Sequence, residues 1–419
     1  MEGSKAAYQQ AEFIDDRYYT TPVHGDRPWE YAHLDHTEMD VKLRHSRIKK
    51  KKFRRKAWLT LLIDSRTRRV LASHKSFEKP SRVSCMMVIR DCVLRHGRLP
   101  DCIVVDGGSE FISKYFEKLL ARYNCDIQWR PPTKPRFGSI IERFIHTLNK
   151  QLLHNLLGNT KIMKRARQVT KEVDPDTHAV WTLPLLDEAL DRYFYEEYDT
   201  REHSSLGQSP REAFNELMEK FNPPSPYSIN YDQIFLIETM IPVKRGALKV
   251  QQSRGIKVFG TWYKCREFRD PVVIGTKVPV HLDPDDVSHV YAYVKNRWIE
   301  CFARARVLAL LRGKSIRLMR IISIEERERS RSYYQNANVR LEELARCHST
   351  REETEREEQQ RLADEEAKEI TARKERLKLI DVVKDHRNEA KEIGLGFDDE
   401  PEQNIVPAKL LTFKRTRRR

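Results

Sequence analysis

Three acidic residues stand in local contexts that suit phosphoryl-transfer chemistry. Asp35 lies in a stretch of strand-like composition, and Asp106 ends the apolar run Ile103-Val104-Val105. Glu142 stands early in a predicted helix. Phosphodiester cleavage and joining need charge stabilised on both the attacking and the leaving oxygen, which two Mg²⁺ ions can do. Mg²⁺ prefers oxygen ligands. We therefore predict that Asp35, Asp106 and Glu142 are catalytic and bind two Mg²⁺ ions, which Mn²⁺ can replace.

The elements that must position these acids alternate between strand and helix signals. The expected strands span 31–41, 57–63, 69–73, 102–105 and 126–129, and the expected helices span 80–96, 113–122 and about 139–157. This order predicts an α/β fold with a mixed sheet and flanking helices. If the strands that carry Asp35 and Asp106 pair in mid-sheet, their like charges come together, which favours a bound cation.

The composition predicts a multidomain protein with a polyanionic partner. The chain has 419 residues, 33% of them charged, with a formal net charge of +16. This length suggests two or three domains, and the charge favours nucleic acid, although it does not separate DNA from RNA or an anionic membrane. No apolar run is long enough to cross a bilayer, and the start lacks a signal-peptide pattern, so we expect a cytoplasmic, nucleoid-associated location. Seven cysteines without a C-x-x-C pair indicate reduced thiols.

Basic residues cluster between the first two expected strands. Lys42–Lys56 holds ten Lys or Arg and no acid. A solvated hairpin loop is one explanation, but such a dense cluster of one sign favours contact with the DNA backbone. The candidate DNA contacts are Lys49, Lys50, Lys51, Lys52, Arg54, Arg55, Arg143 and Lys150.

Acidic residues also cluster in the helical stretch Leu185–Tyr195 and just beyond it. We expect these side chains to form a solvated helix face rather than to be further metal ligands. They are Asp187, Glu188, Asp191, Glu196 and Glu197.

The second half of the chain changes character twice. Prolines in 222–226 indicate a linker over 221–240. Residues 241–306 have strand composition, with expected strands at 256–263, 278–282 and 290–294. Basic residues interleaved with Tyr and Trp suit nucleic-acid binding there, and an ordinary barrel core with a basic rim explains them equally well. Residues 307–419 are predicted to be a charged helical tail with a basic end, in which 325–387 is a solvated helix or a loose coiled coil.

Three motifs resemble the DDE transposases of the retroviral-integrase superfamily, and most closely their TnsB and phage Mu branch. The motifs are Asp35-His36-Thr37 preceded by Trp29, Asp106-Gly107-Gly108-Ser109-Glu110-Phe111, and Gly138 through Leu148. Tyr198 and residues 201–214 are similar to the segment that closes the catalytic domain. The resemblance implies an RNase H-like catalytic core over 27–220 after a lead-in segment 1–26, and a Mu-transposase-type β-barrel over 241–306.

The resemblance also implies a function. Such an enzyme cleaves the 3′ ends of a mobile DNA element and joins them to target DNA, with two Mg²⁺ ions held by the three acids. It acts as a homo-multimer on DNA, and its C-terminal part contacts an AAA+ ATPase that selects the target.

The chain departs from the family at its start, which leaves three hypotheses. Family members carry helix-turn-helix modules before the catalytic domain, whereas about 26 residues precede it here. We expect either a truncated chain or end recognition by a separate protein. The favoured hypothesis is an active transposase. The others are a truncated or repurposed transposase that serves as a non-catalytic DNA- or ATPase-binding module, and an RNase H-like nuclease that only hydrolyses.

Overall fold

A computed structural model provides the coordinates of the chain. The structure describes residues 24–44, 54–107, 114–130, 138–161, 174–221, 228–258, 261–284, 286–303, 308, 311–319, 321 and 355–392. The described part divides into two compact units, Met1–Arg373 and Lys374–Arg419, whose boundary falls inside helix α12 (Glu355–Glu392).

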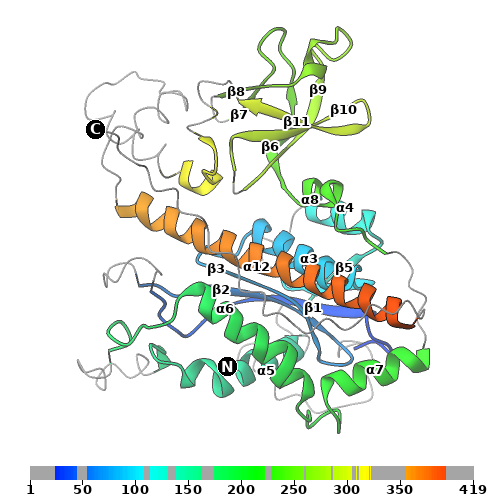
Figure 1. Cartoon of the computed structure of the whole chain (residues 1–419), viewed down its shortest axis with the longest axis vertical. Coiled ribbons are helices and arrows are strands. Elements are labelled where there is room, and N and C mark those ends of the chain that lie inside the picture. The colour runs from blue at the N-terminus through cyan, green and yellow to red at the C-terminus, as the bar shows by residue number, and fades with distance from the viewer. Residues whose placement is uncertain are drawn as a thin grey trace, which may run out of the picture. The chain divides into compact units, whose positions relative to one another are not determined.

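The first unit contains a five-stranded mixed sheet in the order β3-β2-β1-β4-β5 (Figure 1). β1 (Tyr31–Glu38), β2 (Trp58–Asp64) and β3 (Val70–Ser76) form an antiparallel meander. β4 (Cys102–Val105) runs parallel to β1, and β5 (Asp126–Trp129) runs parallel to β4. This is the arrangement of the RNase H-like fold, as predicted, and β1 lies at its centre beside β4.

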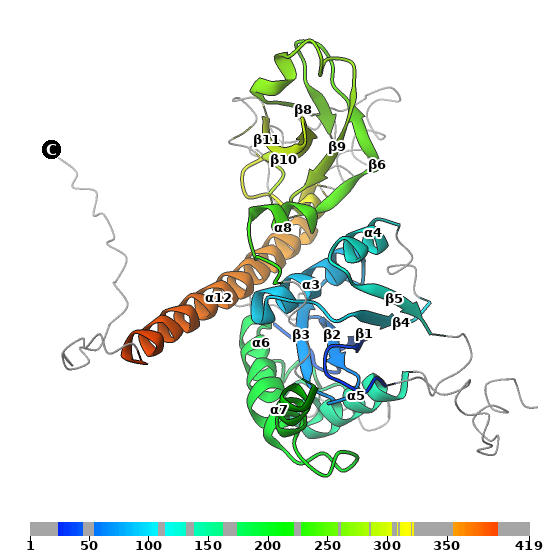
Figure 2. The ribbon, with the colours of Figure 1, turned by 90° about the vertical axis from the view of Figure 1, so that its right-hand side faces the viewer.

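Helices cover both faces of this sheet (Figure 2). Successive side chains of a strand point to opposite faces. Leu62 of β2 therefore packs with α3 (Arg82–His96) and α4 (Lys114–Arg122), while Leu59, Leu61 and Ile63 pack with α5 (Ser139–Gln151) and α6 (Leu183–Arg192). The result is two hydrophobic cores, one on each side of the sheet.

The helix ends follow local chemistry. α3 begins after Ser81, whose hydroxyl accepts a hydrogen bond from the Val83 N–H, and it ends at Gly97 with φ 63°. α5 is shorter than predicted: it ends at Gln151 and is followed by a 3₁₀ turn, Leu153–Asn155. α6 continues into a π-helical segment, Tyr193–Tyr198, before α7 (Pro210–Phe221).

The predicted linker contains a docked helix, α8 (Gln233–Glu238). Asp232 caps it by accepting from the Phe235 N–H. Arg90 of α3 donates to Thr239 Oγ1 at 2.6 Å, and the Tyr123 hydroxyl after α4 donates to Glu238 at 2.6 Å. These contacts attach the second half of the segment 221–240 to the RNase H-like part.

A curled six-stranded antiparallel sheet follows, in the order β6-β9-β10-β11-β8-β7. Its strands are β6 (Ile241–Lys249), β7 (Ile256–Val258), β8 (Thr261–Lys264), β9 (Lys277–Leu282), β10 (His289–Val294) and β11 (Arg297–Ala303). The stretch predicted as one strand, 256–263, is instead a hairpin of β7 and β8. Tyr263 fills the core and donates its hydroxyl proton to the Val287 carbonyl at 2.6 Å. The sheet is a half-barrel that matches the expected β-barrel in position and strand direction.

The C-terminal helix α12 begins inside the first unit and is not simply solvated there. Ala363 and Ile370 are buried in the core that contains α5 and α6. Asp364 is also buried and accepts a hydrogen bond from the Ser315 hydroxyl. The prediction of a solvated helix or a loose coiled coil for most of this length therefore does not hold for residues 355–373, because one face of this charged helix packs on the RNase H-like part.

Two further expectations concern cysteines and membrane spans. The six cysteines that the structure describes are free, in agreement with reduced thiols, and Cys347 lies outside the described residues. Among the helices of the described part, none is long and apolar enough to cross a membrane.

Candidate active site

The sheet brings Asp35 and Asp106 together. β1 and β4 pair in parallel with Ala32 beside Ile103 and His33 beside Val104. If this register continues for two more residues, Asp35 lies beside Asp106. Asp106 directly follows the last residue of β4. Burial raises the pKa of Asp35, and the nearby charge of Asp106 raises it further. The predicted pairing of the two acid-bearing strands is confirmed.

Arg130 is the cation beside Asp35. Its Nη1 atom lies 3.3 Å from Asp35 Oδ2, and its backbone N–H donates to the Val105 carbonyl at 2.8 Å, which fixes it at the end of β5. The His36 N–H donates to the other carboxylate oxygen of Asp35 at 2.7 Å. Arg130 and this N–H both lower the pKa of Asp35 and so oppose the effect of burial. Sequence reasoning missed Arg130, which directly precedes Pro131 and Pro132 in the sequence.

Glu142 lies near the same guanidinium. It is in the first turn of α5 and is exposed. A Cβ atom placed on Gly138 would lie 2.8 Å from Arg130 Nη1 and 2.8 Å from Glu142 Oε1, so these two atoms are at most twice that distance apart. Arg130 is therefore near both Asp35 and Glu142, and Gly138 leaves the space in which the Arg130 and Glu142 side chains approach.

The donor set suits a hard cation, but its members are not gathered around one point. Within the described residues, no group of three His, Cys, Asp or Glu side chains is close enough to hold a metal ion. The Asp35 and Asp106 carboxylates are close enough to repel each other, which a cation would relieve. The buried Nε and Nη2 atoms of Arg130 have no partner among the described atoms, so this guanidinium has free donors for an anionic group.

The predicted DNA contacts divide into three groups. Lys49–Lys52 lie outside the described residues. Arg55 is half-buried and stacks on Phe77 at 4.4 Å from the ring centroid, which gives it a packing role. Arg54 is also half-buried, whereas Arg143 and Lys150 are exposed on α5.

The acidic cluster on α6 is not the solvated face that we expected. Asp187 is fully buried and Asp191 nearly so, and both bind Lys75 of β3, at 2.9 and 2.6 Å. Arg373 of α12 also binds both carboxylates. Only Glu188, Glu196 and Glu197 are exposed as predicted. The prediction failed for Asp187 and Asp191 because their cationic partners are far away in the sequence.

Comparisons with known proteins agree with this architecture. The TnsB C-terminal domain model matches residues 33–158, and the Mu transposase C-terminal model matches residues 239–300. A curated relative, the transposase for transposon Tn552 of Staphylococcus aureus, is 22% identical over 302 residues, covering 70% of this chain and 58% of the relative. The chain thus spans little more than half of that relative's length.

Solved structures of retroviral integrases were also matched. The HTLV-2 integrase catalytic core domain in complex with magnesium is 14% identical, with a TM-score of 0.29, over 45% of this chain and 99% of that one. The simian T-cell lymphotropic virus intasome in complex with PP2A regulatory subunit B56 gamma is 12% identical, with a TM-score of 0.32, over 70% of this chain and 80% of that one.

Proposed function

Since the chain is of the TnsB and Mu transposase type, with a TnsB-type domain ahead of a Mu-transposase-type domain, we propose that it is a DNA transposase. In this proposal it cleaves the 3′ ends of a mobile element and joins them to target DNA. The catalytic residues are Asp35, Asp106 and Glu142. The catalytic core is 27–220, the β-module is 241–306, and residues 1–26, 221–240 and 307–419 are the lead-in, the connection and the tail.

One observation carries the proposal. Asp35 and Asp106 lie side by side on neighbouring strands, and the Arg130 guanidinium is near both Asp35 and Glu142 of α5. Carboxylates that meet in this way need a compensating positive charge. The three acids would hold two Mg²⁺ or Mn²⁺ ions, which when bound stabilise charge on the attacking and leaving oxygens of the phosphodiester.

The chain's own residues prepare this place for a DNA strand. The His36 N–H donates to one oxygen of Asp35, and Arg130 opposes the increase in the pKa of Asp35 that burial causes. The unpartnered donors of Arg130 are available to a phosphate oxygen. We propose that Arg130 is a positioning residue that aligns Asp35 and the reacting strand.

The half-barrel supplies a second DNA-facing candidate. Arg254 and Lys257 lie over the Trp262 ring, at 5.9 and 5.7 Å from its centroid. Such a pairing of cations with an aromatic ring suits a phosphate backbone. We propose that this surface contacts DNA, that the chain acts as a homo-multimer on DNA, and that its C-terminal tail contacts an AAA+ ATPase.

Analysis of the reaction products tests the proposal against its two competitors. A pre-cleaved oligonucleotide from the DNA that flanks the gene, labelled at its 5′ end, is incubated with the full chain, Mg²⁺ and a supercoiled plasmid. Label joined to plasmid supports the transposase. Shortened label without joining supports a nuclease, and DNA binding without any product supports a non-catalytic binding module.

A further inference from the structure

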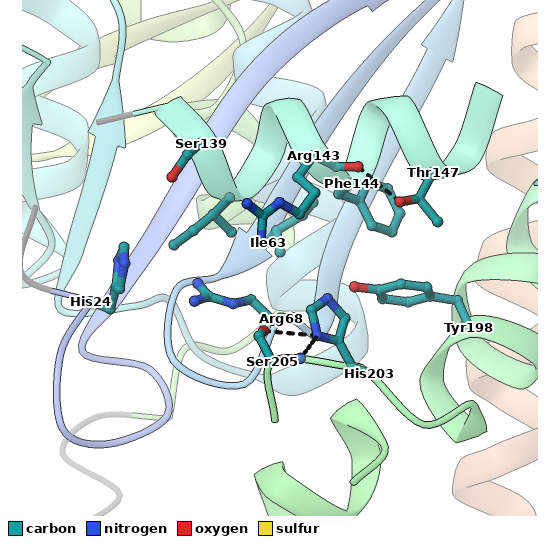
Figure 3. A pocket seen from close by; sticks show the side chains of 11 residues that line it. His24, Ile63, Arg68, Ser139, Arg143, Phe144, Thr147, Tyr198, His203 and Ser205 are labelled. Carbon is teal, nitrogen blue, oxygen red and sulfur yellow. Dashed lines mark hydrogen bonds between the residues drawn. The ribbon is translucent and has the colours of Figure 1, made fainter. Parts of the chain in front are cut away.

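A cavity of about 170 Å³ lies beside α5 (Figure 3), and Glu142 is not part of its lining. Ser139, Arg143 and Thr147 of α5 form one wall. Arg68, in the turn between β2 and β3, and His203, in the loop after the π-helical segment, form the opposite side. Sequence reasoning missed this cavity, because its lining comes from parts of the chain that only the fold brings together.

The lining carries positive charge without a counter-ion. None of its described residues is an acid. Four of them are basic: His24, Arg68, Arg143 and His203. Burial, Arg68 and Arg143 lower the pKa of His203, and burial, Arg68 and Arg66 lower the pKa of His24 to about 4. Each group therefore opposes the charge of the others, and a bound anion would relieve all of them.

The hydrogen bonds leave donors aimed at this space. The Ser205 N–H donates to His203 Nδ1 at 3.3 Å, so the neutral ring carries its proton on Nε2 and can donate from there. The buried Nδ1 atom of His24 has no partner among the described atoms. Figure 3 shows the side chains of Arg68, Arg143 and His203 directed into the same space. Arg68 Nη1 donates to the Ser65 carbonyl. The other guanidinium N–H groups of Arg68 and those of Arg143 suit a phosphate group.

His33 connects the cavity with the candidate active site. It is buried on β1, two residues before Asp35, so the two side chains are on the same side of the strand. Its Nε2 atom lies 3.3 Å from Ser65 Oγ, and the Ser65 carbonyl accepts a hydrogen bond from Arg68 of the cavity. His33 and Ser65 therefore connect the cavity lining with the strand that carries Asp35.

We propose that this cavity binds one non-reacting backbone phosphodiester of the DNA strand whose neighbouring linkage reacts at Asp35, Asp106 and Glu142. This assignment rests on the proposed function. The cavity is too small for a duplex, so it accepts a single group of the polymer. Arg68 and Arg143 supply the charge, and His203 adds a directed donor.

Equilibrium DNA binding in EDTA tests the assignment, because no turnover is needed. Arg68→Gln and Arg143→Gln, each in the full chain, should weaken binding to a fluorescent oligonucleotide about five- to tenfold and reduce its salt slope by about 1. Arg192→Gln is the matched control, since Arg192 is exposed on α6 and is not among the residues that line the cavity. Equal losses in all three variants, or unchanged binding in both cavity variants, would overturn the proposal.

Two further measurements separate phosphate recognition from a structural role. The titration midpoint of the His203 ring, assigned with His203→Gln, should move to higher pH when DNA binds, because a phosphate favours the charged imidazole. No movement in a chain that binds DNA contradicts the proposal. Inorganic phosphate should compete only weakly. Strong competition that Arg68→Gln abolishes, with DNA binding intact, would assign the cavity to free phosphate instead. DNA joining is measured in a separate assay. If joining fails, the binding result still shows whether the cavity contacts DNA.

Discussion

Asp35 and Arg130, separated by 95 residues, form an ion pair of 3.3 Å at the centre of the candidate active site. Both side chains are largely shielded, with exposed fractions of 17% and 9%. The pair matters because burial and the charge of Asp106 raise the pKa of Asp35, and Arg130 opposes this increase.

Arg130→Gln should reduce DNA joining at least tenfold and lower the free energy of unfolding by about 2–3 kcal/mol, because a buried charged hydrogen bond is lost. Urea denaturation and the joining assay check the two effects. Arg27→Gln is the matched control: its 2.9 Å pair with Asp101 is about 40% exposed on each side, so its loss should cost less than about 1 kcal/mol. Equal behaviour of the two variants would remove the special role of Arg130.

Gly138→Ala should impair joining while leaving the fold intact. The added methyl group would lie 2.8 Å from both Arg130 Nη1 and Glu142 Oε1, and those side-chain ends can move away. We therefore expect joining to fall at least tenfold and the free energy of unfolding to change by less than about 1 kcal/mol. A variant that joins DNA normally would show that the approach of Arg130 and Glu142 is not needed for the reaction.

Lys75→Met should be among the most destabilising single substitutions. Lys75 is fully buried between Asp187 and Asp191, so its removal takes away the one fully buried cation that both carboxylates share. The expected loss is about 3–5 kcal/mol by urea denaturation. Lys79→Met, at an exposed position after the same strand, should change stability by less than about 0.5 kcal/mol. A small effect of Lys75→Met would mean that Arg373 and Arg95 neutralise the two carboxylates without it.

Stability should fall as the pH is lowered below about 6.5. Burial lowers the pKa of His281 to about 4, so the unfolded chain takes up a proton that the folded chain refuses between pH 6.5 and 4. The stabilising contribution is complete above that range and is lost toward its lower end, with a slope of at most about 1.4 kcal/mol per pH unit. His281→Asn keeps an N–H donor for the Ile237 carbonyl and should reduce this slope. An unchanged slope would exclude His281 as a source.

The local elements were predictable where periodicity and breakers are strong. β4 and β5 have the predicted bounds, Cys102–Val105 and Asp126–Trp129, and Gly97 ends α3 as expected. The adjacency of Asp35 and Asp106 also followed from the order of elements. These features depend on short stretches of sequence, in which the spacing of apolar residues indicates which side chains are buried.

The missing features depend on contacts between distant segments. Asp191 is 116 residues from Lys75, and a pattern of charges on one helix cannot show that such a partner exists. Helix α8 has only six residues, too few for a periodic signal. The basic cavity combines His24, Arg68 and His203 from three separate segments, and each of them alone resembles an ordinary surface charge.

DNA joining by amide variants of the three acids tests the central claim most directly. Asp35→Asn, Asp106→Asn and Glu142→Gln remove a charge and keep the side-chain shape, while Asp126→Asn and Glu188→Gln make the same changes at exposed positions of β5 and α6. The joined product should disappear in the first three variants and persist in the two controls, at equal folding and DNA binding. Joining that survives in Asp106→Asn or Glu142→Gln would contradict the account.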